Sequence, residues 1–329
     1  MNRFKQASSF NADEAELRAI REGVSSAVVG AYDERLSKEL IDFAKVDLGE
    51  SPFRRPEWET QDAAETDLVG RALDVIKLRR ELLGRLYPFR IDGSQLSYQP
   101  GVSPIYEFLL ATSEAVSHGG RDYQRLVRHF ERIAAKLVAA FLGPDSISCR
   151  FGWPSEDFFE RMPTKFHPRV DRMRSECRFG DDEWKINSSS LQAAQIQKMK
   201  DGKIDFIVRR PIVDARVGSF AVVGQCGCGR EDVREESNKH REVNSDWLAN
   251  LFDQTTVPRP VLVFATSQHI VCEGQLESKQ QTGQALLFDR VRLVLQAAKT
   301  PIGQSRYELW MSLLTRFVKE NPPKSIEAA

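Results

Sequence analysis

The chain lacks any uninterrupted apolar run of the ~18 residues that a membrane-spanning helix requires. Its first residues, MNRFKQASSFNADEAELR, also lack the apolar core of a secretory signal peptide. Net charge is absent too, because 47 Lys and Arg residues balance 47 Asp and Glu residues. These absences predict a cytoplasmic protein with no membrane partner, and they leave only local charge to indicate binding of nucleic acid.

The five cysteines are scattered and odd in number, which favours reduced thiols in a reducing compartment over a disulfide framework. Cys226 and Cys228 form a C-x-C pair, whereas zinc sites usually combine two pairs with wider spacing. A zinc site that adds Cys149 and Cys272 is therefore the minor alternative. Cys226 as a nucleophile has no base partner that the sequence identifies.

Two further motif classes are missing. The five histidines form neither an H-x-x-x-H pair nor a Ser–His–Asp arrangement. The glycine-rich stretch GQCGCG lacks G-K-[ST], which excludes a Walker phosphate-binding loop. What is present is an ordinary globular composition, 41% hydrophobic and 29% charged, with ample apolar material for a core.

The first part of the chain is mostly helical in pattern. Apolar residues at helical spacing predict helices over 12–46 and 61–86. Asp92-Gly93 lies between short β-prone runs and predicts a small hairpin. We expect residues 1–118 to form a helical region that serves as a docking or regulatory surface.

The remaining residues, 119–329, predict an α/β domain in which helices flank a small mixed sheet. The run VLVFA, between prolines and polar residues, is typical of a buried strand. The elements expected after residue 100 are helices over 104–117 and 121–142, short helices near 155–162 and 191–200, a hairpin over 203–226, a helix over 231–252, a strand over 257–268, and helices over 284–299 and 303–320.

The hairpin over 203–226 places two polar residues opposite each other. If its turn centres on Ala215, Asp205 on the first arm pairs with Gln225 on the second. Directly opposed residues have Cβ atoms about 4.5–5.5 Å apart, close enough for a carboxylate and an amide oxygen to share a cation. In the alternative interpretation, Asp205 caps the turn after the preceding Asp-Gly pair and Gln225 merely ends a strand.

Glu131 lies at the margin of the apolar stripe of the helix over 121–142. From this margin it could project toward the sheet as a third oxygen ligand. The alternative is a boundary residue that pairs with Arg128 or Arg132 on the same helix, a common kind of contact that contributes little to stability.

These residues resemble the motifs of the PD-(D/E)XK nuclease superfamily, in the order of a helix with Glu131, GKID with Asp205, and GQC with Gln225. More narrowly, FLGPDSISCRFGWP and DGKIDFIVRRPIVDARVGSFAVVGQCGCG are similar to bacterial restriction-endonuclease-like proteins of anti-phage defence, over residues 121–270. The resemblance implies a PD-(D/E)XK-like core and a metal-dependent endonuclease that hydrolyses DNA phosphodiester bonds. It implies DNA and other protein subunits of a defence complex as partners.

The resemblance also implies Mg²⁺ or Mn²⁺ held by Glu131, Asp205 and Gln225, with the backbone carbonyl of Cys226 as a further oxygen. The family lysine, two residues past the last ligand, is replaced here by Gly227.

Arg230, or Lys239 on the following helix, could supply a cation from elsewhere. Residues 165–216 carry 12 Lys and Arg against 8 Asp and Glu, a local excess that suits a phosphate surface. Without the lysine, the alternative is a catalytically inactive nuclease-fold subunit that binds nucleic acid or scaffolds a complex.

Overall fold

The protein divides into two compact units in a computed structural model, and each unit is described by itself. One contains Met1–Ala111, His269–Cys272 and Gly303–Ala329, and the other contains Thr112–Gln268 and Glu273–Ile302. The structure describes residues 2–26, 57–118, 121–152, 163–187, 199–212, 219–234, 237–257, 259–300, 312, 315 and 316.

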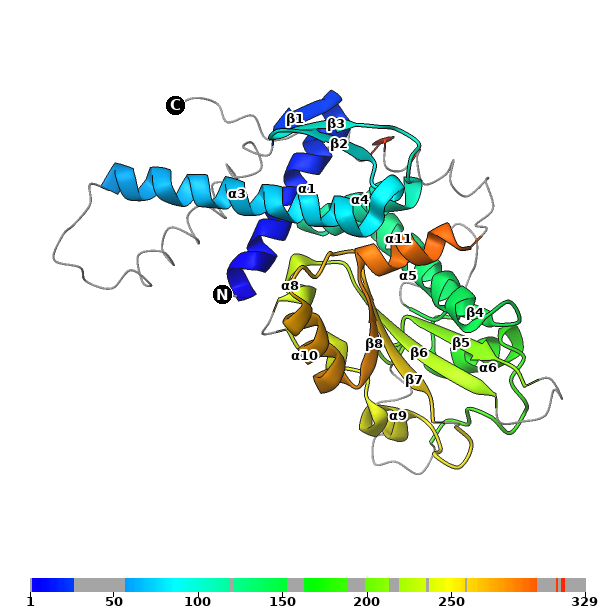
Figure 1. The fold of residues 1–329 in the computed structure, drawn as a ribbon. Helices are drawn as coiled ribbons and strands as arrows, with labels where there is room; N and C mark the ends of the chain where they lie inside the picture. The colour runs from blue at the N-terminus through cyan, green and yellow to red at the C-terminus, as the bar shows by residue number, and fades with distance from the viewer. Residues whose placement is uncertain are drawn as a thin grey trace. The chain divides into compact units, whose positions relative to one another are not determined.

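The first unit combines long helices with a three-stranded antiparallel sheet (Figure 1). The predicted hairpin is confirmed, and Gly93 takes the left-handed φ of +59° in its turn. The elements are α1 (Asn2–Glu22), β1 (Val24–Ser26), α3 (Glu57–Leu83), η2 (Gly84–Leu86), β2 (Phe89–Asp92), β3 (Gln95–Tyr98) and the start of α4 (Pro104–His118).

One helix prediction in this unit is wrong. The apolar spacing predicts a helix over 12–46, but α1 ends at Glu22 and the chain enters β1. Gly23, with φ of +81°, lies directly after the helix, and glycine in this conformation commonly ends helices. Residues 27–46 lie outside the described part of the chain, whereas the second predicted helix is confirmed as α3.

The second unit is built on a five-stranded mixed sheet of order β4-β5-β6-β7-β8 (Figure 1). Strands β4, β5 and β6 are antiparallel, and β6, β7 and β8 are parallel. The α/β class and the mixed sheet are therefore confirmed. The strands are β4 (Ile147–Arg150), β5 (Phe206–Arg210), β6 (Phe220–Gly227), β7 (Val261–Thr266) and β8 (Ala285–Phe288).

Helices flank this sheet. The longest, α5, spans Arg121–Leu142 as predicted and packs against β4, β5 and β6. Arg150 pairs with Phe206 in the register and reaches Glu131 on α5, so α5 lies on the face that carries Phe206. The other helices are α6 (Phe166–Glu176), α8 (Arg230–Val233), η3 (Lys239–Arg241), α9 (Ser245–Leu251), α10 (Glu273–Gly283) and α11 (Arg290–Ala298).

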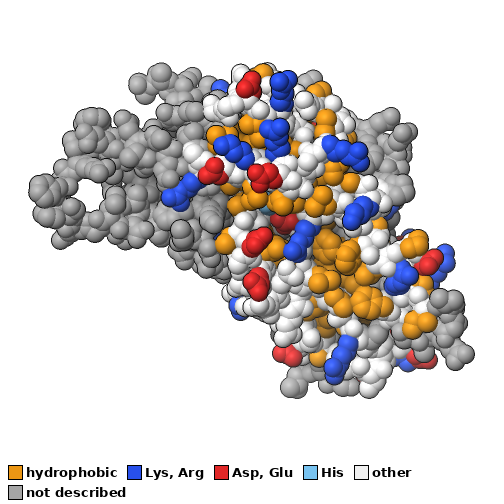
Figure 2. Space-filling model, viewed as in Figure 1, with side chains coloured by type: hydrophobic (Ala, Val, Ile, Leu, Met, Phe, Trp, Pro, Cys, Tyr) orange, Lys and Arg blue, Asp and Glu red, His pale blue; other side chains and the backbone are white. Residues whose placement is uncertain are grey.

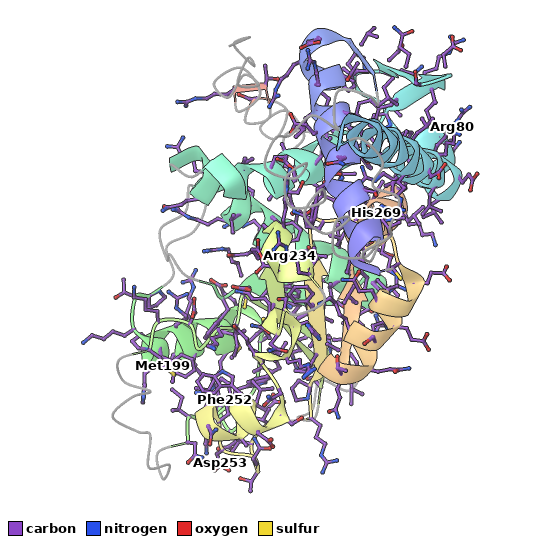
Figure 3. All side chains as sticks on the ribbon, turned by 90° about the vertical axis from the view of Figure 1, so that its left-hand side faces the viewer. Arg80, Met199, Arg234, Phe252, Asp253 and His269 are labelled. Carbon is purple, nitrogen blue, oxygen red and sulfur yellow. The ribbon has the colours of Figure 1, made fainter. Side chains whose placement is uncertain are left out.

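The opposite face of the sheet carries an aromatic core. Ile207 and Val223 of the paired strands lie in one cluster with residues of α6 and α9. Phe252, labelled in Figure 3, packs edge-on against Trp184 with ring centroids 5.1 Å apart. This core holds the hairpin against the helices that precede and follow it.

Several predicted elements of the second unit are wrong. The helix over 231–252 is three short pieces, because Asn244 caps a new helix by accepting a hydrogen bond from the Trp247 N–H. The helix over 284–299 is β8 followed by α11, since the apolar run ALLF pairs with β7. Strand β4 and helices α6 and α10 were not predicted. The proposed helix near 155–162 lies outside the described residues, as do 191–198 and most of 303–320.

Hydrophobic side chains also gather on the surface over the strands of the five-stranded sheet, as Figure 2 shows. Phe220 on β6 is 44% exposed and Leu286 on β8 is 39% exposed. Isolated exposed apolar residues are normal, but a contiguous group of them marks a surface where other molecules can bind.

Candidate functional site

Asp205 lies just before β5, where its backbone is held from both sides. Its N–H donates to the carbonyl of Gly224 at 3.0 Å, and its carbonyl accepts from the N–H groups of Phe151 and Gly152 at 2.7 and 2.9 Å. The register pairs Phe206 with Gly224, as a turn centred on Ala215 predicts, and the paired residues end there, next to Asp205. The residue is thus fixed at the point where β4 ends and β5 begins.

The side chains of Asp205 and Gln225 bind different partners. Asp205 Oδ2 accepts a hydrogen bond from the backbone N–H of Cys226 at 2.7 Å. Gln225 is buried, and its Oε1 accepts from the N–H of Val243 at 3.1 Å, in the segment before α9. Cys226 therefore contacts Asp205 through its N–H group, and the amide oxygen of Gln225 helps to anchor the segment that contains Val243.

Glu131 reaches the same region from α5. The side chain is buried, and its Oε2 lies 2.5 Å from Nε of Arg150 at the end of β4. Glu131 thus forms an ion pair with a residue of the sheet, which shows that its carboxylate points inward from the helix. A buried carboxylate needs such a partner, because desolvation of an unpaired charge is costly.

Gly152 marks the place where the two carboxylates meet. A Cβ atom on this glycine would lie 2.8 Å from Glu131 Oε2 and 3.0 Å from Asp205 Oδ1. Both oxygens therefore approach one point, and only glycine leaves that point open. The structure brings Glu131 and Asp205 together although 74 residues separate them in the sequence.

Both carboxyl groups are less acidic than usual. Burial raises the pKa of Glu131 to about 8, although Arg150 lowers it in part. Burial also raises the pKa of Asp205 to about 7, against the effects of the Cys226 N–H and Lys239. Asp205 as a whole residue is partly exposed, whereas Glu131 is buried. Perturbed carboxyl groups that converge in a shielded place are candidates for chemistry.

Three further charged residues surround the pair, and the sequence reasoning missed them. Asp201 acts electrostatically on both carboxylates. Arg150 binds Glu131, and Arg169 on α6 donates through Nη1 to the carbonyl of Gly152 at 2.9 Å. Arg169 thereby positions the end of β4. The signal available in the sequence was the charge of Arg150 next to apolar residues of the segment ISCRF.

Gly227, the position at which the resembled nuclease superfamily has a lysine, is closely surrounded in this fold. A Cβ on Gly227 would lie 2.7 Å from Phe264 and 2.8 Å from Asp232, so a longer side chain has no room there. Lys239 on η3 lies near Asp205 instead. Burial lowers the pKa of Lys239, but the charges of Asp205, Asp232 and others raise it above its ordinary value overall.

The second predicted cation, Arg230, binds elsewhere. Its Nη2 lies 2.6 Å from Oε1 of Glu114 on α4, and Glu114 is buried. Of the two candidates to replace the missing lysine, Lys239 is therefore the one whose charge interacts with Asp205.

Within the described ranges, no group of three or more His, Cys, Asp and Glu side chains is arranged to hold a metal ion. None of the described helices is both long enough and apolar enough to cross a membrane.

No protein-family model, curated protein or solved structure gives a significant match to this chain. The mixed α/β fold and the carboxylate pair at Gly152 are therefore the features of the molecule that bear on its function.

Proposed function

We propose that the protein is a metal-dependent nuclease with a PD-(D/E)XK-like core, which hydrolyses phosphodiester bonds of DNA. The observation that carries this proposal is the convergence of Glu131 and Asp205 on one point beside Gly152. Helix α5 supplies Glu131, and the segment that leads directly into β5 supplies Asp205, in the order that the motifs suggest. Its place as a subunit of a bacterial anti-phage defence complex rests on the resemblance of the motifs alone.

The carboxylate pair suits a hard divalent cation. Mg²⁺ and Mn²⁺ prefer oxygen ligands, and one or two carboxylates with water and substrate phosphate suffice for Mg²⁺. Glu131 and Asp205 would hold the ion, and Gln225 and the carbonyl of Cys226 remain the predicted additional ligands. When bound, the ion would supply positive charge that polarises the substrate phosphate.

The other residues of the site support this chemistry through position and charge. The N–H of Cys226 fixes the orientation of the Asp205 carboxylate. Lys239 carries a positive charge beside Asp205, where it can stabilise the charge that develops on the scissile phosphate. In this proposal Lys239 replaces the lysine that has no room at Gly227.

Nicking of supercoiled plasmid DNA in the presence of Mg²⁺ or Mn²⁺ tests the proposal. Asp205→Ala should lower the rate by at least about 100-fold, since residues that only support metal ligands already contribute 10–100-fold. Asp182→Ala is the matched control, because Asp182 lies on the surface in a pair with Lys185. If D205A cuts as fast as wild type and D182A, the nuclease proposal is wrong.

A second candidate is a catalytically inactive subunit with the same fold that binds nucleic acid or scaffolds a complex. Two observations favour it: the position of Gly227 cannot hold the lysine, and the amide oxygen of Gln225 is bonded to Val243. Wild type that binds DNA in a mobility-shift assay but does not cut with either ion would support this candidate over the first.

A further inference from the structure

Arg150 binds the oxygen of Glu131 that lies next to Gly152. Its Nε lies 2.5 Å from Glu131 Oε2, and the two side chains are only 2% and 5% exposed. That oxygen also lies 2.8 Å from the position of a Cβ on Gly152, the point that Asp205 Oδ1 approaches within 3.0 Å. The same Glu131 oxygen therefore lies beside both the Arg150 guanidinium and the position at Gly152 that Asp205 approaches.

An ion held by Glu131 and Asp205 would meet the guanidinium at this oxygen. Two cations that share a ligand repel each other strongly where water is excluded, because the effective dielectric constant there is far below that of water. Burial is the largest influence on the pKa of each carboxyl group, and the positive charge of Arg150 opposes it at both. Arg150 therefore interacts with the whole pair and not with Glu131 alone.

We propose that Arg150 is a built-in counter-cation, which holds Glu131 in the absence of metal and sets a low affinity of the site for divalent ions. The inference rests on the proposed function, because it takes the Glu131–Asp205 pair as the cation site. An arginine suits this role, since its guanidinium stays charged and forms directional bonds to carboxylates. Arg150 is a positioning residue here, because it acts on the ion through Glu131.

Binding of Mn²⁺ alone, measured by calorimetry or by electron paramagnetic resonance without DNA, tests the proposal. Arg150→Gln keeps a hydrogen-bond donor for Glu131 but removes the charge, so it should bind Mn²⁺ at least about ten-fold more tightly than wild type. Arg150→Lys keeps the charge and should stay within about three-fold of wild type. Equal affinities of R150Q and wild type would overturn the proposal.

A second pair of variants answers the question if R150Q does not fold, which circular dichroism would reveal. In Glu131→Gln the charge of Arg150 faces Asp205 alone, and in the double variant E131Q/R150Q both charges of the ion pair are removed. The double variant should bind Mn²⁺ at least about ten-fold more tightly than E131Q, because the repelling charge is gone. Equal affinities in this pair also overturn the proposal.

Asp205→Asn separates the role of Arg150 from the metal site itself. If D205N loses Mn²⁺ binding while R150Q matches wild type, the metal site stands and the role of Arg150 is wrong. If D205N binds Mn²⁺ as wild type does, the carboxylate pair is not the cation site, and the proposed function and this inference both fail.

Discussion

Glu131 and Asp205 are carboxylates in surroundings that disfavour charge. Water is largely excluded from Glu131, which forms an ion pair with Arg150. Asp205 takes a single backbone N–H from Cys226. Two such groups near one point destabilise each other when both are ionised, and a proton or a metal ion relieves this. Protonation of the pair and binding of a divalent ion should therefore both stabilise the folded protein.

Stability should depend on pH through this pair when metal is absent. The pKa of Glu131 rises from 4.5 to about 8 and that of Asp205 from 3.8 to about 7, so the folded state binds more protons than the unfolded state between these values. The free energy of unfolding should then fall as pH rises through this window. Glu131→Gln should flatten the fall, measured by urea unfolding in EDTA at several pH values.

Glu231→Gln is the control for this measurement. Glu231 lies on the surface of α8, where its side chain is 74% exposed beside Arg234. This variant should keep the wild-type dependence on pH. If E131Q keeps the wild-type slope as well, the raised pKa of Glu131 is not what links stability to pH.

The β5–β6 hairpin is the element that sets Asp205 in place, and its packing explains one glycine. Gly224 lies opposite Phe206, whose ring fills the space where a side chain on residue 224 would be. A Cβ there would lie 2.0 to 2.3 Å from atoms of this ring. The ring and the glycine therefore fit together as a pair, one residue away from Asp205 and Gln225.

Gly224→Ala should destabilise the hairpin. The methyl group must displace the Phe206 ring or the strand, and overpacking of this kind costs about 1–3 kcal/mol or more of the free energy of unfolding. Gly274→Ala on α10 is the matched control, because no atom lies within 4 Å of its added Cβ. It should leave stability unchanged or raise it by up to ~1 kcal/mol, since alanine favours helices over glycine. Equal midpoints in urea for both variants would contradict this account.

The elements that the sequence predicted well are those with a strong local pattern. Helix α5 has one apolar stripe, and β5 and β6 alternate around turn residues, so their extents or register follow from the sequence. The helix predicted over 231–252 failed because its polar stretch carries no apolar period, and capping by Asn244 divides it. The short apolar run ALLF of β8 is compatible with a helix or a strand in the sequence alone. Its pairing with β7 makes it a strand.

Buried charge in the whole molecule is not confined to the carboxylate pair, because the first unit contains a buried arginine. Arg79 on α3 is fully buried and forms ion pairs with Asp13 at 2.7 Å and Glu16 at 2.9 Å on α1. Its Nε also donates to Nδ1 of His269 at 3.1 Å, and Figure 3 shows His269 beside α1. Glu16 in turn accepts hydrogen bonds from two buried tyrosines, Tyr87 and Tyr106. Arg79 thus links helix α3 to helix α1.

Arg79→Met should destabilise the first unit by about 3–5 kcal/mol, because it removes the positive charge that pairs with two buried carboxylates. Hydrogen exchange should show this as a loss of amide protection in α1 and α3 of about 100-fold or more. The neighbouring Arg80→Met is the control. Arg80 is exposed on the same helix and is labelled in Figure 3, so its loss should change stability by less than about 0.5 kcal/mol. Equal protection in both variants would contradict a structural role for the network.

Local sequence patterns were enough to predict the α/β class, the helix that carries Glu131, and the hairpin register that pairs Phe206 with Gly224. These follow from local periodicity, which specifies the buried face of each element. Only the tertiary structure decided which charges surround Asp205. Arg150 and Lys239 approach it from segments far apart in the chain, and the closed space at Gly227 depends on Phe264 of another strand. Packing between elements sets such contacts, and no local pattern encodes them.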